Sequence, residues 1–253
     1  MTRAQRQSTP APPLTHDEIM RRADAILSKY EAAVGRDSII RDGMRFRDLY
    51  ESVVYPDYEI ELVEGVDLGV DADGYKILGV YDVEANTAFI DACIGPDSGD
   101  PRRTFTLHHE VLGHGVLQGA WLRKRLTDEE RSPFVVTTEH SLSPRTIREL
   151  ERQANAFAAR TSAPPWLLDV AVFECFRPTK AFIYLGPTQY WLEAYGISRP
   201  YQVESLHDLC RCMALQVRRR FDDLSTESLA YRIADSSWVH DRTRRVELRR
   251  VAL

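Results

Sequence analysis

Three histidines and one glutamate lie within one short segment of the chain: His108, His109, Glu110 and His114. Neutral imidazole nitrogens are good ligands for zinc, and a glutamate beside them can take a proton from water that a metal ion activates. The residues around them are largely apolar, and burying so many polar groups without a partner would be costly. The cluster therefore predicts a metal site, with His109 and His114 as ligands and Glu110 as the general base.

The spacing of these two ligands is one residue longer than in the common zinc motif. His109 and His114 follow the pattern HExxxH, whereas HExxH places its histidines four positions apart on one helix face. On a regular helix, residues five positions apart point roughly 140° away from each other, so they would not share an ion. A single π-bulge would realign them, and Gly113 and Gly115 lower the cost of an irregular backbone. We therefore expect a departure from α-helical geometry here.

A third protein ligand must come from another segment, because a catalytic zinc ion normally has three. A predicted helix over residues 144–161 offers Glu149 and Glu151. These two side chains are about 200° apart around a helix, so only one of them can face the metal. His108 points about 100° away from His109 and is interpreted as a surface residue or as a residue that supports the ligands.

The two helices resemble segments of the ImmA/IrrE family of metallopeptidases. The first contains Arg-Arg-Thr-Phe-Thr-Leu-His-His-Glu and the second Glu-Arg-Gln-Ala-Asn-Ala-Phe-Ala-Ala, similar to the family's RFTLAHELGH-like and ExxANxFAA-like patterns. The resemblance covers roughly residues 15–170. It implies that His109, His114 and Glu151 bind zinc (Zn²⁺) and that Glu110 is the general base. The additional residue before His114 departs from the family pattern, although dipeptidyl peptidase III has a similar HELLGH segment.

The same resemblance implies a function. It indicates a cytoplasmic zinc-dependent endopeptidase whose protein substrate is a helix-turn-helix transcriptional repressor, cleaved during a stress response. The alternative is a catalytically inactive relative, in which the extra residue of HExxxH disrupts the site and the C-terminal helices bind a protein or DNA. Neither the oligomeric state nor the identity of the repressor follows from the sequence.

The composition restricts the class of protein. Hydrophobic residues make up 43% of the 253 residues and charged residues 28%, which is enough for a substantial core. No run approaches the roughly 18 apolar residues of a membrane span, so we expect no membrane association. The net charge of −5 argues against nucleic acid as a partner. Four cysteines are too few for a disulfide scaffold, which favours a reducing cytoplasmic compartment.

Hydrophobic spacing and turn signals predict the elements that position the site. A helix begins after Thr15, with Glu18 completing a capping box. Asn86 favours a tight hairpin between two strands, because asparagine tolerates the left-handed conformation. The predicted strands cover residues 57–63, 75–83 and 87–94, and the predicted metal-binding helices cover residues 103–117 and 144–161.

Together these elements predict an α+β fold. Residues 15–170 would form a compact zincin-like metallopeptidase core, with a small antiparallel sheet packed on the pair of zinc-binding helices. Residues 1–14 are rich in proline and polar residues and predict a disordered lead-in. Residues 171–253 are mostly helical in pattern and predict a helical C-terminal extension that packs on the core. The polar stretch around His140 predicts a lid or a loop that faces the substrate.

Overall fold

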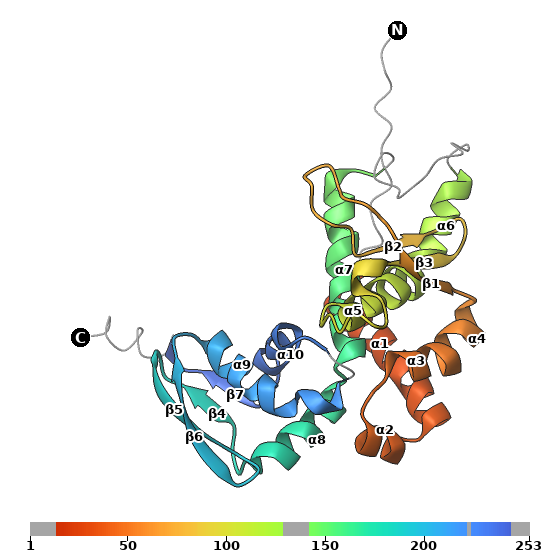
Figure 1. Ribbon diagram of the computed structural model, residues 1–253. Helices are drawn as coiled ribbons and strands as arrows, with labels where there is room; N and C mark the ends of the chain where they lie inside the picture. The colour runs from red at the N-terminus through yellow and green to blue at the C-terminus, as the bar shows by residue number, and fades with distance from the viewer. Residues whose placement is uncertain (1–13, 129–141, 222–223, 244–253) are drawn as a thin grey trace. The chain divides into compact units, whose positions relative to one another are not determined.

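The computed structural model describes residues 14–128, 142–221 and 224–243, which form two compact units (Figure 1). The first unit comprises the chain up to Val34 and Phe46–Thr161, and the second comprises Gly35–Arg45 and the chain from Ser162 onward. Each unit combines helices with strands, so the fold class is α+β. Residues 1–13 of the predicted lead-in (1–14) and the loop around His140 lie outside the described residues, and Leu14 is buried.

The predicted domain boundary at residue 170 falls inside helix α8 (Pro165–Phe176), whereas the chain passes from the first unit to the second at Thr161. Two prolines explain the position of this change. The preceding helix ends at Ser162, with one residue between it and the pair Pro164 and Pro165, and a residue before proline is disfavoured in helical conformation. Helix α8 then contacts helix α9 of the second unit.

Helices make up most of the first unit. They are α1 (His16–Val34), α3 (Phe46–Leu49), the π-helical η1 (Tyr50–Val54), α4 (Tyr55–Tyr58), the 3₁₀ turn η2 (Ala92–Ile94), α5 (Arg103–Leu107), the π-helical η3 (His108–Gln118), α6 (Gly119–Asp128) and α7 (Pro144–Ser162). The predicted capping box of α1 is confirmed, since the Glu18 amide donates to the Thr15 hydroxyl and the Thr15 amide donates to the Glu18 carboxylate. Helix α7 has nearly the predicted bounds.

The sheet of the first unit consists of β1 (Glu61–Val66), β2 (Gly79–Asp82) and β3 (Thr87–Asp91), in the order β1-β3-β2. Strands β2 and β3 are antiparallel and joined by the predicted hairpin, in which Asn86 has a φ of 53°. Strands β1 and β3 are parallel, so the prediction of an antiparallel sheet is wrong for this pair. The loop between β1 and β2 reverses the direction of the chain, and the hairpin between β2 and β3 reverses it again. Strand β3 therefore runs in the same direction as β1. Strands β2 and β3 both contact η3.

The first strand lies later in the sequence than predicted. Residues Tyr55–Tyr58 form helix α4, and β1 begins only at Glu61. Pro56 lies in the first turn of α4, where a proline needs no hydrogen-bond partner for its nitrogen. Glu59 then ends the helix in a left-handed conformation with a φ of 52°.

The second unit contains strands that the sequence pattern did not indicate. Its helices are α2 (Arg36–Asp42), α8, α9 (Leu206–Val217), the 3₁₀ turn η5 (Arg218–Arg220) and α10 (Thr226–Ala234), and its strands are β4 (Phe182–Tyr184), β5 (Thr188–Ala194), β6 (Ile197–Val203) and β7 (Val239–Asp241). The prediction of a helical extension is therefore wrong for the four strands. Tyr195 and Gly196, with φ values of 52° and 77°, form the two-residue turn that joins β5 to β6.

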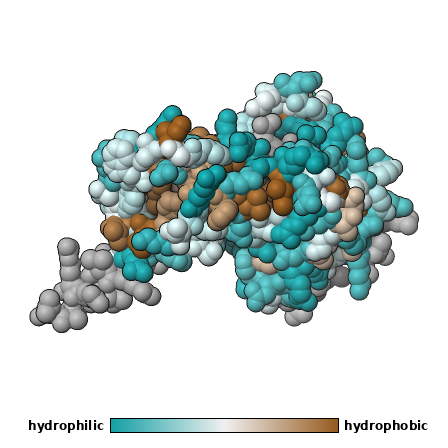
Figure 2. All heavy atoms as spheres, turned by 90° about the horizontal axis from the view of Figure 1, so that it is seen from below, coloured by the Kyte–Doolittle hydropathy of each residue, from teal (hydrophilic) through white to brown (hydrophobic). Residues whose placement is uncertain are grey.

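The visible surface in Figure 2 is largely hydrophilic, with a few hydrophobic areas. None of the helices in the described part of the chain combines the length and the apolar character needed to span a bilayer.

Candidate metal centre

The helix that carries the histidines has π geometry from His108 to Gln118, between α5 and α6. In a π-helix each hydrogen bond joins residues five positions apart. His109 and His114 therefore lie on the same face, which an α-helix would not allow at this spacing. The expected departure from α geometry is present, but it extends over 11 residues instead of a single bulge.

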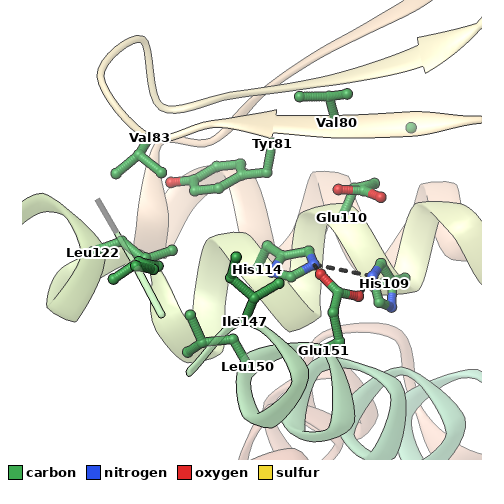
Figure 3. A pocket seen from close by; sticks show the side chains of 12 residues that line it. Val80, Tyr81, Val83, His109, Glu110, His114, Leu122, Ile147, Leu150 and Glu151 are labelled. Carbon is green, nitrogen blue, oxygen red and sulfur yellow. Dashed lines mark hydrogen bonds and ion pairs between the residues drawn. The ribbon is translucent and has the colours of Figure 1, made fainter. Parts of the chain in front are cut away.

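The structure brings together the three predicted ligands, His109, His114 and Glu151 (Figure 3). The Nε2 atoms of His109 and His114 are 3.0 Å apart. The Glu151 carboxylate, which comes from α7, lies 3.2 Å from the His109 Nε2 and 3.3 Å from the His114 Nε2. Two adjacent turns of η3 and one turn of α7 thus each place one potential metal-ligand atom in the same small region.

These distances fit a metal ion. Ligand atoms about 2.0–2.2 Å from one zinc ion, at tetrahedral angles, stand roughly 3.3–3.6 Å from each other. The three separations between the His109, His114 and Glu151 donor atoms are close to this range. Two imidazoles and one carboxylate are also a ligand set that zinc accepts in catalytic sites, where a fourth position stays open. The cluster can therefore hold a metal ion.

Glu149, the other acidic candidate on α7, does not belong to this cluster. Its carboxylate accepts hydrogen bonds from Arg152, at 2.6 Å, and from the Gln153 side chain, at 3.0 Å. These two bonds hold the pKa of Glu149 at about 2. Glu149 and Glu151 point in different directions from α7, as the helical spacing predicts.

Two side-chain hydrogen bonds fasten the two ends of η3 to α7. At the first residue of η3, the His108 Nδ1 lies 2.9 Å from the Thr161 hydroxyl. At its last residue, the Gln118 amide nitrogen donates to the Leu150 carbonyl at 2.7 Å. The first residue of η3 is bonded near the end of α7 and the last residue of η3 is bonded nearer the start of α7. The two helices therefore run in opposite directions. Glu151, one residue after Leu150, reaches the two histidines through its side chain.

His108 is fully buried, which corrects the interpretation as a surface residue. The Thr161 hydroxyl can donate to the Phe157 carbonyl at 3.0 Å, so it accepts from the Nδ1–H of His108. Burial lowers the pKa of His108 to about 3, so its ring is neutral at pH 7. His108 supports the helix that carries the ligands and does not face the cluster.

The glycines of the motif lie within the π-helical segment, and they also permit close packing. Neither Gly113 nor Gly115 has a positive φ. A Cβ atom on Gly113 would lie 2.8–3.0 Å from Ala154 of α7, including its backbone. A Cβ atom on Gly115 would lie 2.7 Å from the end of the Ile60 side chain. Gly113 therefore permits the close approach of η3 and α7 that brings Glu151 to the histidines.

Gln118 fixes the orientation of His114. Because the Gln118 amide nitrogen is bonded to the Leu150 carbonyl, its side-chain oxygen faces the His114 Nδ1 at 3.0 Å. The Nδ1 atom must then carry the proton, which leaves the Nε2 lone pair directed at the cluster. His109 has no such hydrogen bond among the described residues, and its ring stacks on Phe105 at 6.3 Å between ring centroids.

The ionisable ligands influence each other's charge. Burial alone would raise the pKa of Glu151, but its bonds to His109 and His114 outweigh burial and lower it. For His114, burial would lower the pKa, and the bond to Glu151 together with the charge of Glu110 raises it. The carboxylate of Glu151 is therefore ionised at neutral pH, as a metal ligand must be.

Glu110 lies between η3 and β2, apart from the three ligands (Figure 3). It is only 8% exposed, and burial raises its pKa. A raised pKa suits a carboxylate that must accept and then return a proton near neutral pH. Gly79 of β2 makes room for it, since a Cβ atom there would lie 2.6 Å from the Glu110 Cγ.

These residues surround a pocket of about 280 Å³. His109, Glu110, His114 and Glu151 form one part of its wall, and strand β2 with the apolar side chains of α6 and α7 forms another (Figure 3). A pocket that joins a possible metal site to a buried carboxylate has the components of a hydrolytic site.

Sequence reasoning missed Gln118 and Gly79. Gln118 carried a usable signal, because it is a polar residue four positions after His114 within an apolar helix. Gly79 carried none, because its function depends on the contact between β2 and η3.

In comparisons with known proteins, no family model matches the chain and no curated protein matches it significantly.

Proposed function

We propose that this protein is a zinc-dependent endopeptidase of ImmA/IrrE type, with a compact zincin-like core in the first unit. The observation that carries the proposal is the convergence of His109, His114 and Glu151 beside the buried Glu110. The resemblance of two separate segments, in the same order as in that family, also supports it. The resemblance further implies a cytoplasmic enzyme that cleaves a helix-turn-helix repressor and so regulates transcription in a stress response.

The residues of the site have separate tasks in this proposal. His109, His114 and Glu151 would hold the ion, which supplies Lewis acidity towards a peptide carbonyl and lowers the pKa of water. Glu110 takes a proton from the attacking water and returns it to the leaving amine. The raised pKa of Glu110 favours the uptake of this proton.

Strand β2 offers a place for an extended polypeptide. It is the last strand of its sheet on the side of the pocket, and Gly79, Val80 and Tyr81 line that pocket. An extended peptide can add to such an edge through main-chain hydrogen bonds. The edge therefore favours a polypeptide substrate.

The alternative, a catalytically inactive relative that binds a protein or DNA, depends on the additional residue of HExxxH. The π geometry of η3 argues against it, because His109 and His114 face the same point despite that residue. No described contact favours the inactive form.

A Glu110→Gln variant tests the proposal. The zinc-loaded wild-type protein is incubated with a library of peptides from a proteome digest, and new N-termini are identified by mass spectrometry. We expect Glu110→Gln to bind zinc normally and to cleave about 10²–10⁴-fold more slowly, since it lacks the base. Glu149→Gln, on α7 but outside the cluster, is the matched control and should cleave normally.

Two results would contradict the proposal. One is a zinc-loaded wild-type protein that cleaves no peptide, which would favour the non-catalytic alternative. The other is undiminished cleavage by Glu110→Gln, which would remove Glu110 from the mechanism.

A further inference from the structure

One part of the pocket differs in chemistry from the part that holds the ligands. On the side of His114 away from His109, its wall is made of aliphatic side chains beneath the ring of Tyr81 (Figure 3). These residues, together called the apolar subsite, are Val83 after β2, Leu122 of α6, and Ile147 and Leu150 of α7.

Tyr81 presents its ring to this region because its hydroxyl is held elsewhere. The hydroxyl donates to the Asn86 side-chain oxygen at 2.7 Å and accepts from Arg123 at 3.0 Å. Asn86 in turn donates to the Glu59 carbonyl at 2.7 Å, which fixes it in place. The polar end of Tyr81 is thus satisfied without a ligand, and the ring adds to the apolar wall.

Among the described residues that line the apolar subsite, none is charged. The charged side chains of the pocket, Glu110 and Glu151, belong to its other part. A charged substrate group placed in the subsite would lose its hydration and gain no partner. An apolar side chain would instead remove both its own surface and that of the wall from water.

The location of the subsite identifies what it would bind. It begins at His114 and shares one continuous pocket with Glu110. A group bound there is therefore adjacent to the peptide bond on which Glu110 acts. The whole pocket, at about 280 Å³, has space for several water molecules of about 30 Å³ each, and hence for one large side chain.

We propose that the apolar subsite binds a large aliphatic or aromatic side chain on a substrate residue that flanks the scissile bond. The substrate class is then polypeptides with leucine, isoleucine, methionine or phenylalanine at that position. This inference rests on the proposed function, because it assigns part of the specificity of the same site.

Zinc-chelating probes test the inference without requiring cleavage. The probes are N-acetyl-leucine hydroxamate, N-acetylglycine hydroxamate and N-acetyl-aspartate hydroxamate, titrated against the zinc-loaded full-length protein. Because they share the chelating group, differences in their dissociation constants report on the side chain. We expect the leucine probe to bind about tenfold or more tightly than the glycine probe, and the aspartate probe to bind no better than glycine.

A variant that fills the subsite gives the second measurement. Ile147→Trp should abolish the advantage of the leucine probe while zinc content and binding of the glycine probe stay unchanged. The matched control is Arg148→Trp, which adds the same ring to an exposed position of α7. It should retain the wild-type preference.

The outcomes separate the two proposals. Equal binding of the leucine and glycine probes to the zinc-loaded protein would overturn the apolar subsite and leave the metallopeptidase proposal intact. An unchanged leucine preference in Ile147→Trp would also overturn it. A protein that binds neither zinc nor any hydroxamate would overturn the proposed function and the subsite together.

Discussion

Gln118 is the residue that connects the orientation of His114 to the position of α7. Its oxygen faces the His114 Nδ1, and its nitrogen donates to the Leu150 carbonyl, one residue before Glu151. It is fully buried, so no water competes for these bonds. Residues that orient a metal-bound histidine in this way raise metal affinity although they do not touch the ion.

Replacement of Gln118 tests this connection. We expect Gln118→Leu to weaken zinc binding about 10–100-fold, because the His114 ring loses the acceptor for its Nδ1 proton. Gln118→Glu keeps that acceptor and should give a smaller loss. Competition with a chromophoric chelator measures both affinities, and ¹⁵N NMR of the imidazoles reports which nitrogen of His114 is protonated. Wild-type affinity in Gln118→Leu would contradict the role assigned to Gln118.

At the scale of elements, the site depends on the close packing of η3 against α7. The two helices approach each other closely at Gly113, where a Cβ atom would meet the backbone of Ala154. Backbone atoms cannot move as easily as the end of a side chain. The separation of the two helices is therefore fixed by a glycine.

A comparison of two alanine substitutions in η3 tests this packing. Gly113→Ala should push η3 away from α7, lower the free energy of unfolding by about 1–3 kcal/mol and weaken zinc binding. A Cβ atom on Gly115 would meet most closely the end of the Ile60 side chain, which can shift, and would lie 3.3 Å from the Tyr81 ring and 3.5 Å from the Glu110 carbonyl oxygen. We therefore expect Gly115→Ala to have a smaller effect on both quantities. Chemical denaturation and zinc titration provide the values. A larger effect at Gly115 would contradict the described packing.

The C-terminal end of β3 is stabilised by one buried carboxylate. Asp91 is 1% exposed and accepts hydrogen bonds from the amides of Leu68, at 2.7 Å, and Cys93, at 2.9 Å, while Lys76 lies 3.0 Å away. Burial alone would raise the pKa of Asp91, but these partners outweigh burial and hold it below its usual range.

This arrangement predicts a pH dependence of stability. Since the pKa of Asp91 is lower in the folded chain, its contribution is complete above the ordinary value of about 3.9 and is lost as the pH falls towards the folded-state pKa. We expect Asp91→Asn to cost about 2 kcal/mol at pH 7, with a difference from wild type that shrinks below pH 4. Denaturation at a series of pH values measures it. A difference that is constant down to pH 2 would contradict the prediction.

The sequence was most informative about elements with local signals. Thr15 with Glu18, and the α7 segment from Pro144, follow capping and hydrophobic rules that depend on neighbouring residues. Strand partners depend on distant residues, so the parallel pairing of β1 with β3 was not predictable in this way. Strands β4 and β7 have only three residues each, and β5 and β6, with seven residues each, alternate too weakly in burial to stand out from a helical pattern.

At the scale of the whole molecule, the metal cluster and the pocket belong to the first unit alone. The sequence indicated His109, His114, Glu110 and Glu151 because motif spacing and family resemblance are local properties. It did not indicate the length of the π-helix, which is tied to α7 at both ends. The site thus forms only when η3 and α7, whose ligand residues are more than 30 positions apart in the sequence, pack together.

Removal of zinc should therefore affect the two units differently. With free zinc at about 1,000 times its dissociation constant, chelation would lower the stability of the first unit by about 4 kcal/mol. Hydrogen exchange should accelerate in residues 103–118 and 144–162 after chelation and stay unchanged in residues 188–203. Equal changes in both units would contradict the placement of the metal in the first.

The central claim is that His109, His114 and Glu151 bind a metal ion, and metal analysis tests it most directly. The protein is purified without chelators, dialysed against zinc and measured by inductively coupled plasma mass spectrometry. We expect about one zinc ion per chain, retained in Glu110→Gln and Glu149→Gln and lost in His109→Ala and His114→Ala. A wild-type protein that takes up no zinc, or histidine variants that keep it, would contradict the account.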